Sequence, residues 1–81
     1  MKITILLFAA ARETAGRDSV EIDTAGKASV RMVREQLLDQ VPRLSAFASS
    51  LLWAVNNKYA AMEQIIDEGD VVACFPPVSG G

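Results

Sequence analysis

The two ends of the chain carry its most apolar segments, and this pairing limits the fold more than any other feature. Residues 2–8 (KITILLF) and 71–75 (VVACF) are short and rich in apolar side chains, so both are predicted to be strands. Successive side chains of a strand point to opposite faces, and in these two segments both faces are largely apolar. We expect the two strands to be central neighbours in one sheet, and a crossover connection between them makes the pairing parallel.

A chain of 81 residues has too little material to bury both faces of these strands within itself. We therefore assign Ile3, Ile5 and Leu7 to the core and expect a partner protein to cover the opposite face. The alternative is that both faces are buried inside the domain. The side chains expected on the partner-binding face are Leu6, Phe8, Tyr59, Ala73 and Phe75.

A hairpin is predicted at the start of the chain. Residues 18–23 alternate apolar and polar side chains, which is typical of a strand that pairs antiparallel with the first. Residues 9–16 are expected to be a connection between the two strands. Its only charged residues, Arg12 and Glu13, either lie in solvent or take part in docking.

A helix should follow the hairpin, and after it the chain should alternate short elements and turns. Ser29 is a suitable N-cap, and Pro42 ends or kinks the helix. Its apolar face is expected to hold Val30, Val33, Leu37 and Val41. Residues 43–50 are ambiguous, and their apolar side chains fit one or two short helical turns. The later elements are expected to be a strand over 51–55, a turn at 56–57, a short returning strand over 58–61, a loop or helical turn over 62–67, and a turn at 68–70.

These elements predict an α+β domain with the order ββαββ, in which the short returning segment and an irregular turn precede the last strand. A helix placed between the hairpin and the later strands packs across one face of a mixed sheet. This is the β-grasp arrangement of ubiquitin-like proteins. The domain is expected to cover residues 1–75, with an extended arm over residues 76–81.

The predicted arm has an unusual composition for a chain end, because it carries no ionisable side chain. Each proline fixes φ at about −65° and removes a backbone donor, so the last strand should end at Phe75. Glycines without a Cβ could lie in a narrow tunnel of another protein. The alternative is a frayed terminus. We expect the α-carboxylate of Gly81 to be inserted into a pocket of another protein by a threading arm of Pro76, Pro77, Val78, Ser79 and Gly80.

Composition excludes several classes of function. The net charge is −2 and the isoelectric point is about 4.9, which disfavours binding to nucleic acid or to an anionic membrane. No apolar run approaches the roughly 20 residues of a membrane span. With one cysteine and no histidine, the chain cannot form an internal disulfide, a zinc site or a Cys-His or Ser-His nucleophilic pair. We expect a cytoplasmic protein that holds no metal and is not catalytic alone.

Three further features are interpreted as structural. Cys74 has no basic neighbour in the sequence to lower its pKa, so we expect a buried and inert thiol. Trp53 is expected in the core or at its rim. Asp67, Glu68 and Asp70 lack the spacing of a calcium loop, and we interpret them as a solvated turn or a docking patch for a basic partner.

Two stretches resemble one known family. Residues 69–81 (GDVVACFPPVSGG) and 8–16 (FAAARETAG) are similar to parts of the small, sulfur-carrying subunit of molybdopterin synthase, a ubiquitin-like protein. The resemblance implies that a separate E1-like activating enzyme uses ATP to adenylate Gly81, and that sulfur from a persulfide then makes a thiocarboxylate. It also implies that the arm enters the large catalytic subunit and donates sulfur to cyclic pyranopterin monophosphate, forming the dithiolene of the molybdenum cofactor. The chain itself would bind no cofactor.

Other interpretations stay open at this point. The thiazole sulfur carrier and ubiquitin-like modifiers share the Gly-Gly end, and in them Gly81 would end on a thiazole precursor or on a lysine. The Pro-Pro-Val-Ser stem favours molybdopterin over both. A binding module whose C-terminal carboxylate merely docks in a pocket is a further alternative, and it would form no acyl-adenylate.

Overall fold

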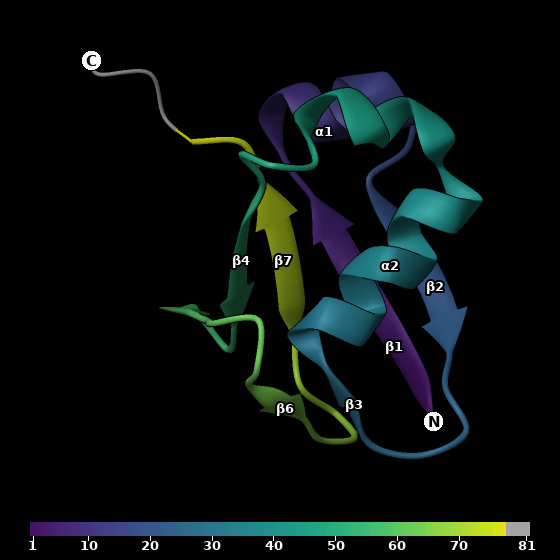
Figure 1. Ribbon diagram of the computed structural model, residues 1–81, viewed down its shortest axis with the longest axis vertical. Helices are drawn as coiled ribbons and strands as arrows, with labels where there is room; N and C mark the ends of the chain where they lie inside the picture. The colour runs from purple at the N-terminus through teal and green to yellow at the C-terminus, as the bar shows by residue number, and fades with distance from the viewer. Residues whose placement is uncertain (78–81) are drawn as a thin grey trace.

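A mixed sheet forms the centre of the structure, which is a computed structural model that describes residues 1–77. The strands of the whole structure are β1 (Lys2–Leu7), β2 (Ser19–Asp23), β3 (Ala28–Ser29), β4 (Leu52–Val55), β5 (Lys58–Tyr59), β6 (Ile65–Ile66) and β7 (Val72–Phe75). Its helices are α1 (Ala9–Ala15), α2 (Val30–Gln40) and the 3-10 helix η1 (Pro42–Phe47). Within these residues the main sheet has the order β2-β1-β7-β4-β5, and β3 and β6 form a second sheet (Figure 1).

The strands from the two ends of the chain are neighbours at the centre of the main sheet, as their apolar faces predict. β1 pairs parallel with β7, and Leu6 lies opposite Ala73. β1 also pairs antiparallel with β2, and β7 pairs antiparallel with β4. The expected hairpin and the expected parallel pair are both confirmed.

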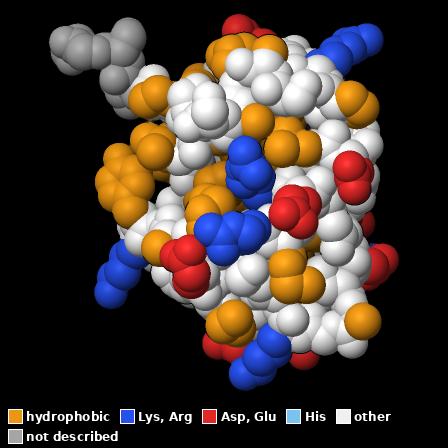
Figure 2. Space-filling model, in the orientation of Figure 1, with side chains coloured by type: hydrophobic (Ala, Val, Ile, Leu, Met, Phe, Trp, Pro, Cys, Tyr) orange, Lys and Arg blue, Asp and Glu red, His pale blue; other side chains and the backbone are white. Residues whose placement is uncertain are grey.

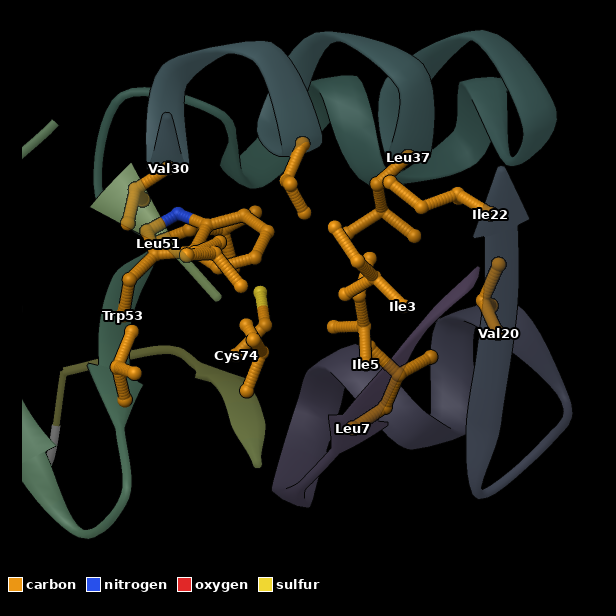
Figure 3. Close-up of a cluster of buried hydrophobic side chains, with 14 of the residues drawn as sticks. Ile3, Ile5, Leu7, Val20, Ile22, Val30, Leu37, Leu51, Trp53 and Cys74 are labelled. Atoms are coloured by element: carbon orange, nitrogen blue, oxygen red, sulfur yellow. The ribbon is translucent and has the colours of Figure 1, made fainter. Parts of the chain in front are cut away.

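The core lies between the main sheet and α2 (Figure 3). The side chains of Ile3, Ile5 and Leu7 are buried, so the predicted core face of β1 is confirmed. Trp53 of β4 points into the same core and is 2% exposed. The helix contributes the fully buried side chains of Val30, Val33 and Leu37.

Both ends of α2 are set by local chemistry. The Ser29 hydroxyl accepts a hydrogen bond from the Met32 backbone N–H at 3.3 Å, which confirms the predicted N-cap. Val41, expected on the apolar face of the helix, is instead its C-cap with φ of −128°, although it still packs against the core. Pro42 cannot donate to the α-helical ladder and begins η1, so the ambiguous stretch 43–50 begins in one of the short helical turns that its pattern allows.

Residues 9–16, expected to be a connection, contain the helix α1. Successive alanines favour a helix, and Ala11 is fully buried. The helix ends at Ala15, and its C-cap Gly16 has a φ of 74° and donates its backbone N–H to the Arg12 carbonyl at 2.9 Å. The expectation of a connection is wrong because Phe8 stands at the N-cap and makes no side-chain cap bond, so the usual polar start signal is missing.

Residues 65 and 66, expected in a loop or helical turn, form the strand β6. It pairs antiparallel with β3, with Ala28 opposite Ile66 and Ser29 opposite Ile65. Ile66 is fully buried whereas Ile65 is 52% exposed, so the two side chains alternate as strand residues do. The predicted ββαββ order therefore lacks one helix and a second small sheet.

The other strand boundaries hold within two residues. β2 begins at Ser19 rather than 18, β4 begins at Leu52 rather than 51, and β5 ends at Tyr59 rather than 61. Among the helices of residues 1–77, none is long and apolar enough to cross a membrane.

Candidate functional site

The face of the main sheet opposite α2 carries an open apolar hollow of about 410 Å³. Two aromatic side chains at this hollow, Phe8 and Tyr59, are 48% and 76% exposed, and exposed apolar clusters mark sites of interaction. Figure 2 shows hydrophobic side chains gathered on the same side of the molecule as the start of the arm. The hollow is lined by Phe8, Ala54, Asn57, Tyr59, Ala73 and Phe75.

The strand register brings these side chains together from neighbouring strands. Ala73 of β7 lies opposite Ala54 of β4, and Ala54 lies opposite Tyr59 of β5. The Tyr59 and Phe75 rings have centroids 6.0 Å apart and planes tilted by 50°, a favourable aromatic arrangement. The structure therefore groups four of the predicted partner-binding residues, Phe8, Tyr59, Ala73 and Phe75.

Leu6, the fifth predicted member of the patch, lies on the same sheet face but lines a neighbouring hollow. It is half-buried, and its position opposite Ala73 puts it next to the first hollow. The second hollow measures about 350 Å³. Its lining residues are Lys2, Thr4, Leu6, Gly69, Asp70 and Val71.

Two residues of the apolar hollow, Ala54 and Asn57, are not among the predicted site residues. Strand alternation predicts that Ala54 lies on the outer face, because Trp53 and Val55 on either side of it are buried in the core. The sequence predicts that Asn57 lies in a turn. It does not predict that the residue lines the hollow, because that depends on the tertiary pairing of β4 with β7.

A tight turn sets the position of Tyr59. Asn56 and Asn57 have φ values of 52° and 68°, a left-handed pair that asparagine tolerates and that joins antiparallel strands closely. The side-chain Nδ2 of Asn56 donates to Asp70 Oδ1 at 3.0 Å, and the side-chain Oδ1 of Asn56 accepts from the Val71 backbone N–H at 2.9 Å. The predicted turn is confirmed, and it is tied to the start of β7.

The predicted arm begins beside the hollow. β7 ends at Phe75, as the prolines predict, and the Phe8 backbone N–H donates to the Cys74 carbonyl at 3.2 Å near this end. Because Phe75 lines the hollow, the half-buried Pro76 and the exposed Pro77 follow directly from its rim. The remaining predicted arm residues, Val78, Ser79, Gly80 and Gly81, lie outside the described residues.

Comparison with known proteins places the chain in a family. The model of the ThiS family matches residues 5–81. The chain belongs to the ThiS family. A relative from Escherichia coli named molybdopterin synthase sulfur carrier subunit is 37% identical, and the match covers 98% of this chain and 99% of the relative. The resemblance drawn from the sequence motifs is confirmed.

Two solved structures share the fold of this ThiS-family chain. The crystal structure of SAMP1, small archaeal modifier protein 1 of Haloferax volcanii, is 31% identical with a TM-score of 0.87 and covers 100% of both chains. A chain in the complex of subunits 1 and 2 of molybdopterin-converting factor from Helicobacter pylori has a TM-score of 0.71 over 100% of both chains. At 20% identity the second likeness concerns the fold alone. The predicted β-grasp class is confirmed.

The cysteine of this ThiS-family chain lies in the core rather than at the hollow. Figure 3 shows Cys74 among the buried side chains, and burial raises the pKa of its thiol to about 12. Only the thiolate is a good nucleophile, so the thiol is unreactive near neutral pH. The predicted burial of Cys74 is confirmed, and its lack of a role in sulfur transfer stays a prediction.

The acidic residues before β7 stabilise a loop. Asp70 accepts a hydrogen bond from the Asp67 backbone N–H at 2.8 Å, and this bond and the Asn56 amide hold the pKa of the Asp70 carboxyl below its ordinary value. Asp67 lies 3.1 Å from the Lys27 ammonium, and Glu68 is exposed. Over residues 1–77, no cluster of three or more carboxylate, thiol or imidazole groups is placed to hold a metal ion. A docking role for this turn stays a prediction.

Proposed function

We propose that this chain is the sulfur carrier of a molybdopterin synthase and that the carboxylate of Gly81 carries the sulfur. The observation that carries the proposal is the near full-length match to a relative of that name, combined with a family match that extends to Gly81. An uncharged arm that begins at the rim of an apolar hollow supports it further.

The chemistry of the arm follows from the low reactivity of a free carboxylate. Attack of the carboxylate on the α-phosphorus of ATP forms an acyl-adenylate and releases pyrophosphate. A persulfide then displaces AMP, and a thiol cleaves the resulting acyl disulfide to leave a thiocarboxylate and a new disulfide. Because the sequence has no phosphate-binding glycine motif, a separate E1-like enzyme supplies the ATP site.

The apolar hollow gives the carrier a surface for the large catalytic subunit. Aromatic residues are enriched at the energetic centres of interfaces, and Phe8, Tyr59 and Phe75 meet at this hollow. A subunit bound there would receive the arm, whose thiocarboxylate donates sulfur to cyclic pyranopterin monophosphate and forms the dithiolene. The carrier binds no cofactor itself and works in the cytoplasm.

Mass spectrometry of the activated chain tests the proposal. Incubation with the activating enzyme, ATP and a sulfur donor should exchange one oxygen for sulfur, and fragmentation should place the change on Gly81. Deletion of Gly81 moves the carboxylate back by about 3.5 Å along an extended chain. Because a misplacement of about 1 Å can cost about a hundredfold in rate, sulfur transfer should vanish while binding through the hollow survives.

Two matched variants separate length from width. One residue added after Gly81 should also abolish transfer, because the reactive group overshoots. Gly80→Ala keeps the length and adds one methyl group, so it should reduce transfer less than the deletion does. A deletion variant that still delivers sulfur would contradict the carrier proposal. It would favour a binding module whose C-terminal carboxylate only docks in a pocket.

A protein modifier is the second candidate, and the likeness to small archaeal modifier protein 1 favours it. In that case the adenylated Gly81 would form an isopeptide bond with a lysine amine and release AMP. Cell extract supplied with the activating enzyme distinguishes the two functions. A carrier should yield thiocarboxylate alone, whereas a modifier should yield conjugates of higher mass that contain a branched Gly81–lysine peptide.

A further inference from the structure

The strand β2 forms one free edge of the main sheet (Figure 1). Residues of an antiparallel strand alternate between bonding their neighbour and pointing their backbone groups away from it. The Leu7 backbone N–H donates to the Asp18 carbonyl at 2.8 Å, and the Thr24 backbone N–H donates to the Met1 carbonyl at 2.9 Å. Even-numbered residues of this strand therefore bond β1. The residues whose N–H and C=O groups point outward are Ser19, Glu21 and Asp23.

Two outward carbonyls of this edge are occupied by side chains from outside the strand. Arg17 Nε donates to the Ser19 carbonyl at 3.1 Å. Gln40 Nε2 donates to the Glu21 carbonyl at 3.3 Å. Arg17 lies two residues before β2 and Gln40 is the last residue of α2, so two separate segments reach the same row of acceptors.

An added strand would need these same acceptors. Exposed edge strands are templates for pairing with another chain, and proteins protect them with charges, short strands or covering groups. At the other edge, β5 has only two residues, so it offers a short template. β2 has five residues and is the longer of the two edge strands. It is therefore the better template for an added strand and the edge where protection matters more.

We propose that Arg17 and Gln40 close the β2 edge against strand addition and so keep two copies of this chain from pairing edge to edge. A symmetric antiparallel pair of β2 strands centred on Glu21 would use the outward groups of Ser19, Glu21 and Asp23 in both copies. In each copy the side chains of Arg17 and Gln40, the two edge caps, occupy two of these three carbonyl acceptors. The Glu21 side chains would also lie opposite each other, and like charges there disfavour the pair. This inference does not depend on the proposed function.

Removing the caps in a background without the charge tests the proposal. Glu21→Thr removes the repulsion and keeps a residue that favours strands. Adding Arg17→Ala and Gln40→Ala should tighten self-association by at least about thirtyfold relative to Glu21→Thr alone, because the dimer then loses four caps and each competed with one intermolecular hydrogen bond. Sedimentation velocity up to millimolar protein gives the dimerisation constant. Hydrogen exchange at the residue 21 amide, which points outward, reports whether the dimer forms at this edge.

A matched control carries Glu21→Thr with Arg43→Ala and Gln64→Ala, which removes the same residue types from exposed positions away from β2. It should stay as monomeric as Glu21→Thr alone. Thermal melts confirm that all variants are folded. Three results overturn the proposal: a triple variant that stays monomeric, a control that dimerises equally, or a dimer whose residue 21 amide is not protected.

Discussion

The two faces of β7 show how one short strand serves both the core and the candidate site. Val72 and Cys74 are fully buried beneath α2, whereas Ala73 and Phe75 are half-buried and line the outer hollow. β1 divides in the same way, with Leu6 on the outer face. Stability should depend on the inner positions and the proposed partner binding on the outer ones, so substitutions at neighbouring positions should change different properties.

The largest effect on stability is expected on the inner side, from Leu37→Ala. Leu37 is fully buried between α2 and the sheet, so the free energy of unfolding should fall by about 2–5 kcal/mol. Urea denaturation measures the loss. The folded fraction should still bind the large subunit normally, and a specific loss of binding there would contradict the division between the faces.

On the outer side, Phe75→Ala should weaken the complex with the large subunit by about 1–4 kcal/mol if the ring is an interface hot spot. Its effect on the free energy of unfolding should be small, because the side chain is only half-buried. Calorimetric titration measures binding and urea denaturation measures stability. Ile65→Ala, an exposed apolar residue of β6 away from the hollow, is the control. A Phe75→Ala variant that unfolds yet binds normally would mean that the faces are reversed.

Cys74→Ala should separate chemistry from packing one position away from Phe75. The variant should lose about 1 kcal/mol of stability and keep sulfur transfer. Because burial raises the thiol pKa from 9.0 to about 12, the unfolded state loses this proton first as pH rises. The thiol therefore lowers stability increasingly between pH 9 and about 12, and the variant should lack this part of the alkaline decline. A folded variant without sulfur transfer would show that the inner face takes part in the chemistry.

The smallest effect is expected where the loop meets β7, at Asp70. The folded-state pKa of this carboxyl is lowered from 3.8, so its stabilising effect is present above 3.8 and is lost as pH falls through the folded pKa. Asp70→Asn keeps an oxygen for Asn56 but loses the acceptor for the Asp67 backbone N–H. Denaturation midpoints measured below pH 4 should depend less on pH in the variant than in the parent chain. Parallel curves would mean that the carboxyl does not stabilise the loop.

The central sheet and the main helix could be predicted because side-chain pattern and burial coincide there. Two strands that are apolar on both faces had to be central, and Ser29 and Pro42 mark the limits of α2 closely. The exposed aromatic residues of the hollow followed from the same observation, since a small domain cannot bury both faces.

The remaining elements depend on contacts that a local pattern does not contain. α1 lacks a polar N-cap and is held by the burial of Ala11. β6 has two residues, too few for a period, and the adjacent Gln64 carbonyl accepts the Val30 backbone N–H at 2.9 Å. The place of Leu6 in a separate hollow required the register between β1 and β7. Tertiary pairing, rather than propensity, decides each of these features.

The parallel pairing of β1 with β7 also has a consequence for how the chain folds during synthesis. The first strand made must wait for the last one before the centre of the sheet can close, and such long-range pairing slows folding. The residues that complete the sheet directly precede the arm. A chain broken or left unfinished before Phe75 would therefore lack both a stable body and the Gly-Gly end, so incomplete copies would be left open to proteolysis.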